Sequence, residues 1–298
     1  MGWLQEFYNQ NSSTINFFGL NAILGLSIYL TLAAGLLSLA NAGFMAIGAY
    51  VSALLTIHGH WPFWAVLPGG ALVAALVAVP LGLPVLRLRG VFLAIATIGF
   101  GEVVRLFFIN WDYAGGALGI NGIPQQTRWY HIFGLLLVLL YCFWRLRGSR
   151  TGFAWEAIRE DESAARTMGV NTTFYKLLAF VLGAFIAGLA GGLQAHLRFI
   201  VDPNDYGFGE AVDILVFAVV GGMNIFVGPV LGAGLITVLP EALRHLRSFG
   251  IQPGPDRTLV SGVVLLLVIL FLPRGLVSLF TEAPRSWARR EEPVAPPA

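Results

Sequence analysis

Residues 63–86 read FWAVLPGGALVAALVAVPLGLPVL, a run of apolar residues that contains no charged side chain. A helix needs about 20 mostly apolar residues to cross the hydrocarbon core of a bilayer. The run therefore predicts a membrane-spanning helix. Arg87, the first Lys or Arg in the chain, follows it directly.

Comparable apolar runs lie on both sides of this segment. The sequence predicts an all-α, polytopic transmembrane helix bundle of about eight or nine spans, at 19–38, 42–58, 63–86, 91–109, 130–146, 174–197, 211–226, 228–246 and 258–272. Gly221, Gly222, Gly228 and Pro229 interrupt the pair at 211–226 and 228–246, which predicts a broken or re-entrant helix there.

The composition agrees with a membrane protein. Hydrophobic residues make up 57% and charged residues 11% of the chain, whereas a soluble domain carries about 25% charged residues. The net charge of +2 is too small to indicate a nucleic-acid partner. The single cysteine, Cys142, allows no disulfide within the chain, and no residue cluster predicts a metal site or a catalytic site.

The basic residues predict how the chain is oriented, because Lys and Arg gather on the cytoplasmic side of membrane proteins. With nine spans and a cytoplasmic C-terminus, the cytoplasmic side receives 12 of the 18 basic residues, namely Arg87, Arg89, Arg145, Arg147, Arg150, Arg159, Arg166, Lys176, Arg274, Arg285, Arg289 and Arg290. The reverse orientation would place only six there. We therefore expect residues 1–18 to be a short extracytoplasmic segment rather than a signal peptide. Residues 19–280 would form the transmembrane domain, and the Pro-rich residues 281–298 a disordered cytoplasmic tail.

No nucleotide site can be built from this sequence. A Walker A loop needs a Gly-rich turn followed by Lys and Ser or Thr. The only lysine, Lys176, stands between Tyr175 and Leu177. If ATP drives the protein, another chain must bind it.

The predicted cytoplasmic loop 150–173 contains an amphipathic pattern. It predicts one helix over about 153–168, ended by Gly169 in a left-handed conformation. One face carries mostly small or apolar residues: Ala154, Ala157, Ile158, Asp161, Ala165 and Met168. The other face carries charged and polar residues, including Arg159 and Glu160. Small residues allow a partner protein to approach closely, so docking is favoured. A helix lying on the lipid surface is the alternative, although it would prefer basic residues and large apolar anchors.

Glycines within the membrane allow two interpretations, close helix packing or helices broken beside a transport pathway. Both stay open for the regions around Asn41 and Gly221. The second interpretation assigns the translocation path to Asn41, Ala42, Gly43, Thr97, Gly99, Gly101, Gly221, Gly222 and Met223.

Charged residues within the predicted spans are sparse. Glu102 and Arg105, three residues apart on one helix, can pair with each other. No chain of buried acids indicates a proton relay, which weakens the alternative of a self-sufficient secondary transporter. No nucleophile–base set indicates an enzyme.

Several of these motifs together resemble the branched-chain amino acid ABC permeases of the LivM type. The similar stretches run from about residue 20 to 280 and are SLANAGFMAIGAY (38–50), RGVFLAIAT (89–97), GFGE (99–102), AIREDE (157–162), MG (168–169), GGM (221–223), GPVLG (228–232) and LPRGL (272–276). As a set they are specific to the family.

The resemblance implies a function and partners. The chain would be the transmembrane permease subunit of an importer that carries Leu, Ile or Val across a bacterial inner membrane. Segment 153–169 would be the coupling helix that docks on a separate ATPase subunit, which binds the ATP, so this chain holds no cofactor. A second homologous permease and a periplasmic substrate-binding protein would complete the assembly. The chain departs from the family pattern at Asn41 and at 115–117, and permeases for urea or short-chain amides share much of the signature.

Overall fold

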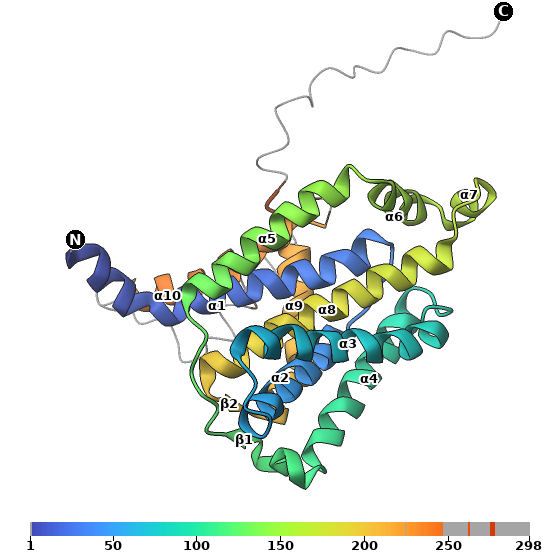
Figure 1. The fold of residues 1–298 in the computed structure, drawn as a ribbon. Helices are drawn as coiled ribbons and strands as arrows, with labels where there is room; N and C mark the ends of the chain where they lie inside the picture. Colours follow the sequence, from blue (N-terminus) through green and yellow to red (C-terminus); the bar gives the residue numbers. More distant parts are fainter. Residues whose placement is uncertain (1, 224, 247–261, 263–274, 278–298) are drawn as a thin grey trace, which may run out of the picture.

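Helices make up most of the described chain, so the prediction of an all-α bundle is confirmed. The computed structural model describes residues 2–223, 225–246, 262 and 275–277 (Figure 1). Within these ranges the elements are α1 (Gly2–Ala33), α2 (Asn41–Ile57), α3 (Phe63–Val85), α4 (Val91–Ile109), η1 (Asp112–Ala114), η2 (Gly116–Leu118), β1 (Ile120–Asn121), α5 (Trp129–Arg147), α6 (Arg150–Glu160), α7 (Glu162–Thr167), α8 (Thr172–Arg198), β2 (Ile200–Val201), η3 (Pro203–Tyr206), α9 (Phe208–Gly221) and α10 (Gly228–Leu246).

Among the residues that the structure describes, five helices are long and apolar enough to cross a membrane: Ser12–Ala33 of α1, and α3, α4, α5 and α8. The helix α2 and the Gly228–Val238 part of α10 are apolar but shorter. Apart from residue 262, the predicted span at 258–272 lies outside the described residues, as does the predicted tail from 281 to 298.

The first helix differs from its predicted bounds of 19–38. It begins before residue 19 and ends at Ala33. Gly35 then takes a positive φ of 72°, a conformation that glycine adopts without steric cost. The chain therefore turns five residues earlier than the apolar run suggests.

The short helix α2 forms the centre of the bundle. It contacts α3, α4, α8 and α9, and 13 of its 17 residues are buried. Its sequence NAGFMAIGAYVSALLTI is rich in small residues. Small side chains let helix backbones approach closely where lipid provides no hydrophobic driving force.

Glycines let the backbones of α2 and α8 approach closely in the core. A Cβ atom on Gly191 of α8 would overlap the carbonyl oxygen of Met45 in α2. A Cβ atom on Gly48 of α2 would likewise overlap the backbone of Gly188. Packing therefore accounts for glycine at these positions.

The outer faces of α3, α4 and α5 carry large apolar side chains that no other described element covers. Leu76 of α3, Val103 of α4 and Leu137 of α5 are each about two-thirds exposed. An apolar surface of this extent is expected to face lipid or another protein chain.

The bundle has two distinct ends (Figure 1). One end holds β1 and β2, which pair antiparallel with Ile120 opposite Val201, together with η1, η2 and η3; we call it the β end. The opposite end holds α6, α7 and the connecting residues 34–40, 86–90, 222–223 and 225–227; we call it the α6 end. An ion pair from Arg89 to Glu162 and a hydrogen bond from Arg159 to the carbonyl oxygen of Met223 join these pieces.

Candidate functional site

The segment predicted as one docking helix is two helices, so the prediction of a continuous helix over 153–168 is wrong. Helix α6 ends at Glu160, and Asp161 takes an extended conformation with φ −153° and ψ 108°. The Asp161 carboxylate accepts hydrogen bonds from the backbone N–H groups of Ser163 and Ala164 at 2.8 and 3.0 Å. Asp161 is therefore the N-cap of α7. Gly169 has a φ of 84°, so its predicted left-handed conformation is confirmed.

The predicted docking residues divide between buried and exposed positions. Ile158 and Ala165 are buried and hold α6 and α7 on the bundle. Ala157, Glu160, Asp161 and Met168 are exposed, and Arg159 is half-buried. Of the predicted apolar face, Ala154, Ile158 and Ala165 pack inward, whereas Ala157, Asp161 and Met168 face outward.

Two of the exposed members, Ala157 and Met168, border a groove between α6 and the start of α8. Its volume is about 570 Å³, and Ala157, Met168 and Gly169 are among the residues that line it. Three large apolar side chains on its border, Phe153, Met168 and Phe174, are more than half exposed. Exposed apolar side chains around a concave surface are typical of a protein interface.

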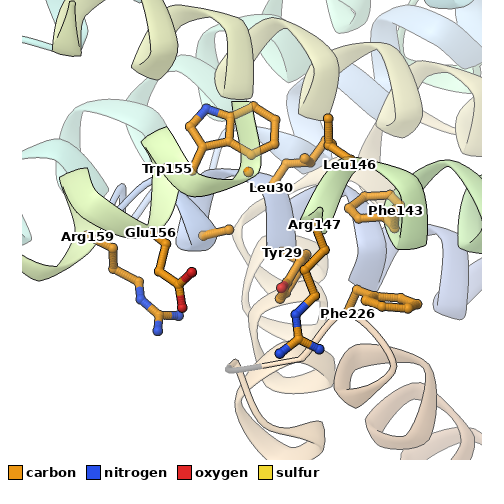
Figure 2. A pocket seen from close by; sticks show the side chains of 11 residues that line it. Tyr29, Leu30, Phe143, Leu146, Arg147, Trp155, Glu156, Arg159 and Phe226 are labelled. Atoms are coloured by element: carbon orange, nitrogen blue, oxygen red, sulfur yellow. The ribbon is translucent and has the colours of Figure 1, made fainter. Parts of the chain in front are cut away.

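Behind this groove, α6 packs against α8 and against a pocket at the centre of the α6 end. The indole N–H of Trp155 donates a hydrogen bond to the carbonyl oxygen of Tyr175 at 2.8 Å. The pocket lies between α1, α5, α6 and residue 226, and Figure 2 shows that Tyr29, Phe143, Arg147, Trp155, Glu156, Arg159 and Phe226 line it. A Cβ atom on Gly35 would lie 3.3 Å from the Cα atom of Arg159. A displacement of α6 would therefore change its contacts with α8, with the pocket side chains of α1 and α5, and with Gly35.

The helix α7 is tied to the bundle by a cluster of charges around Glu162. Its carboxylate lies 2.7 Å from the Nζ atom of Lys176 in α8, 3.0 Å from Arg166 and 3.5 Å from Arg89. Burial raises the pKa of Glu162, but the hydrogen bond from Lys176 and the charges of Lys176, Arg89 and Arg166 outweigh burial, so its pKa lies below the ordinary value. Glu162 is therefore ionised and joins α7, α8 and the 86–90 segment.

Part of the predicted translocation path forms one buried contact between α1, α2 and α4. The Asn41 amide donates a hydrogen bond to the Ser27 hydroxyl at 2.7 Å. The Thr97 hydroxyl accepts a hydrogen bond from the backbone N–H of Leu39 at 2.9 Å. Gly43 faces Phe100 and Gly101, where an added Cβ would lie 3.1–3.2 Å from the nearest atoms. Ala42 is buried in the same region.

The other predicted path residues lie apart from this contact. Gly221 ends α9, and Gly222 follows with a φ of 106°. A Cβ atom on Gly221 would overlap the carbonyl oxygen of Gly228, so close packing explains these glycines. Met223 is 40% exposed. Gly99 is exposed on α4, and an added Cβ would meet no atom within 4 Å.

The pairing of Glu102 with Arg105, which the sequence predicts, is present with an N–O distance of 2.8 Å. The pair lies near the β end. The Glu102 carboxylate accepts a hydrogen bond from the backbone N–H of Phe208 at the start of α9. The Arg105 guanidinium donates one to the side-chain oxygen of Asn204. The pair thus attaches α4 to η3 and α9.

Two features of the α6 end were missed by sequence reasoning. Trp155 falls outside the predicted apolar face, yet it is 3% exposed and anchors α6. Glu162 was placed on the polar face, and Lys176 was considered only as a cytoplasmic basic residue and as a lysine without a P-loop. A lysine at the start of an apolar helix, after a loop that contains acids, was the available signal for their pairing.

Comparison with known proteins assigns the chain to a family. The family model described as branched-chain amino acid transport system / permease component matches residues 11–272. No solved structure matches the chain.

Among curated relatives, the chain is 36% identical over 294 residues to the high-affinity branched-chain amino acid transport system permease protein LivM of Escherichia coli strain K12 and of Salmonella typhimurium strain LT2. That similarity covers 87% of this chain and 66% of the relative, so the chain spans a little under two-thirds of the length of LivM. The chain is also 33% identical over 153 residues to LivH of E. coli K12, covering 51% of this chain and 47% of LivH. It is 29% identical over 194 residues to the autoinducer 2 import system permease protein LsrC of E. coli O9:H4 strain HS, covering 59% of this chain and 54% of LsrC.

The family model thus matches almost the whole chain, including every element that builds the α6 end. This chain belongs to the family of branched-chain amino acid transport system permease components.

Proposed function

We propose that this chain is the transmembrane permease subunit of an ABC importer that moves branched-chain amino acids (Leu, Ile or Val) inward across a bacterial inner membrane. The observation that carries the proposal is the 36% identity to LivM over 87% of the chain. ATP is bound by separate ATPase subunits. A second, homologous permease and a periplasmic substrate-binding protein complete the assembly, and the family match to a permease component supports this division of labour.

The α6 end faces the cytoplasm in this proposal. Basic residues gather on the cytoplasmic side of membrane proteins. Among the described residues whose side chains are placed, the α6 end carries eight of them, whereas the β end carries Arg105, Arg128 and Arg198; the eight are Arg87, Arg89, Arg145, Arg147, Arg150, Arg159, Arg166 and Lys176. This asymmetry supports the predicted orientation, with eight or nine spans in the whole chain.

The ATPase subunit docks on the groove between α6 and the start of α8. The exposed apolar side chains of Phe153, Met168 and Phe174 and the small side chain of Ala157 suit a protein partner. Motion of the ATPase reaches α6 and passes to α1, α5 and the α9–α10 turn through the contacts around Arg159 and the pocket in Figure 2. Segment 153–169 acts as a coupling element made of two helices.

The translocation path runs beside α2 and α4 and along the α9–α10 turn. The residues nearest to it at α2 and α4 are Asn41, Gly43, Thr97 and Gly101. At the α9–α10 turn it passes Gly221 to Met223. A weakly charged path suits a net-neutral zwitterion with an apolar side chain. Selectivity then rests mainly on the binding protein, which delivers the amino acid.

A matched pair of substitutions tests the docking surface. Ala157→Arg places a bulky charge in the groove on an exposed residue, so the fold is retained while docking is blocked. Ala117→Arg makes the same change on an exposed residue at the β end. We expect the first variant to lose copurification of the ATPase subunit and ATP-driven leucine uptake in proteoliposomes. The second should keep the ATPase subunit bound. Normal assembly and uptake of Ala157→Arg would refute the docking site.

The similarity to LsrC supports a second candidate cargo, because LsrC is named as a permease for autoinducer 2 import. ATP hydrolysis by the reconstituted importer should rise with binding protein loaded with Leu, Ile or Val, and not with urea, a short amide or autoinducer 2. Flux through the chain alone under an ion gradient would instead favour a self-sufficient secondary transporter.

A further inference from the structure

A basic cavity lies at the α6 end, between the last turn of α3, the helix α7 and the first turns of α8. Its volume is about 290 Å³. Arg87, Arg89, Arg166 and Lys176 line it, and Glu162 is the only acidic residue among the lining residues. This cavity is separate from the docking groove, because the two have no lining residue in common.

The charges in this cavity are not balanced. Glu162 contacts Arg89, Arg166 and Lys176 together, so one negative charge faces four positive ones and the cavity keeps a net charge of +3. Arg89 and Arg166 remain 73% and 62% exposed, while Lys176 is 10% exposed. The exposed guanidinium groups are therefore available to a second anion, and guanidinium suits the oxygens of a phosphate group.

An apolar stripe leads away from the cavity along α3. Leu83 lines the cavity and is 52% exposed. Leu72, Leu76 and Val79 continue from it at helical spacing and are also exposed. The helix α3 is one of those long and apolar enough to cross a membrane. A ligand that fits both features has an anionic head at the membrane surface and an apolar tail along α3.

We propose that this cavity binds the headgroup phosphate of an anionic phospholipid, with an acyl chain lying along Leu83, Val79 and Leu76. Basic pockets between helices at the membrane surface are suited to anionic lipid headgroups. A free phosphate would satisfy the arginines but would leave the apolar stripe without a role. The site is independent of what the chain transports. Bound lipid links α3, α7 and α8, the same elements that Glu162 joins.

Native mass spectrometry of the purified full-length chain tests the site directly. The chain is titrated with phosphatidylglycerol and, separately, with phosphatidylcholine. We expect tight binding of phosphatidylglycerol that the double variant Arg89→Gln/Arg166→Gln weakens roughly thirtyfold, because each basic residue near the headgroup contributes about a fivefold preference. The control Arg145→Gln/Arg150→Gln removes the same charge from exposed arginines at the same end outside the cavity, and it should keep the affinity.

A variant that is expected to raise the lipid affinity distinguishes a lost binding site from a misfolded protein. Glu162→Gln removes the only acid that lines the cavity, so it should strengthen phosphatidylglycerol binding even as it weakens the attachment of α7. Equal affinity in all variants, or equal loss in the control pair, would overturn the proposal. Displacement of the lipid by excess inorganic phosphate would assign the site to free phosphate. Protection of Arg89 and Arg166 by the ATPase subunit, with no effect of phosphatidylglycerol, would assign it to a protein contact.

Discussion

Glu162 shows how single residues hold the α6 end together. Its carboxylate and the Lys176 ammonium lie 2.7 Å apart, and their side chains are 19% and 10% exposed. Removing one member of such a pair leaves a poorly solvated charge behind. We expect Glu162→Gln to lower the free energy of unfolding by about 2 kcal/mol, measured by thermal or denaturant unfolding in detergent.

The matched control is Glu160→Gln, the same change on a carboxylate that is 75% exposed and 3.8 Å from Arg159. Exposed ion pairs contribute little because water and salt screen them, so this variant should change stability by less than about 0.5 kcal/mol. Equal losses of stability in the two variants would mean that the Glu162 cluster stabilises the fold no more than an exposed ion pair does.

The stability that Glu162 contributes should depend on pH. The folded-state pKa of Glu162 is lowered from the ordinary value of 4.5: burial raises it, but the hydrogen bond and charge of Lys176 and the charges of Arg89 and Arg166 outweigh burial. A carboxylate with a lowered pKa stabilises the fold fully above its unfolded pKa and loses that contribution as the pH falls through its folded pKa. The stability difference between the wild type and Glu162→Gln should therefore stay constant above pH 4.5 and shrink below it. Unfolding curves collected through the acid range check this, and a difference that shrinks near neutral pH would contradict it.

At the scale of helices, the contact between α2 and α8 depends on the absence of side chains. Gly191→Ala would push a Cβ atom into the carbonyl oxygen of Met45 and to within about 3 Å of the Ala49 nitrogen. Overpacking of this kind typically costs about 1–3 kcal/mol, so we expect a lower melting temperature. Gly99→Ala adds the same methyl group to α4, where no atom lies within 4 Å. It should keep or raise stability, because alanine favours helix more than glycine does. If Gly99→Ala is the more damaging change, the packing model of the core is wrong.

Helix positions were largely predictable from the sequence, because a long apolar run has few alternatives in a membrane. The runs at 63–86, 91–109, 130–146 and 174–197 fall within two residues of α3, α4, α5 and α8 at each end. The apolar run at 19–38 was less reliable, since its end depends on the turn at Gly35. The break at Asp161 was missed because helical spacing ignores a side chain that caps the following helix.

The candidate site was less predictable than the helices, because it depends on contacts between distant parts of the chain. Gly169 could be assigned a left-handed conformation from its place after a helix. The exposure of Ala157 depends on how α6 packs against α8 through Trp155. The ion pairs of Glu162 join residues 89, 162 and 176, and no pattern of one helix specifies which of several arginines will reach it.

For the molecule as a whole, the unequal charge of the two ends predicts which side of the membrane each end faces. Cys142, the only cysteine, is first replaced by Cys142→Ser, so that α5 is not labelled in this background. Single cysteines are then introduced by Ser163→Cys in α7 at the α6 end or by Leu118→Cys in η2 at the β end, both at exposed positions. A membrane-impermeant maleimide should modify the Leu118→Cys variant in intact spheroplasts and the Ser163→Cys variant only after lysis, because eight basic residues hold the α6 end inside. The Cys142→Ser background alone should remain unlabelled in both conditions. Modification of the Ser163→Cys variant in intact spheroplasts would place α6 and α7 outside, where no ATPase subunit could reach them, and ATP-driven import through this face would be impossible.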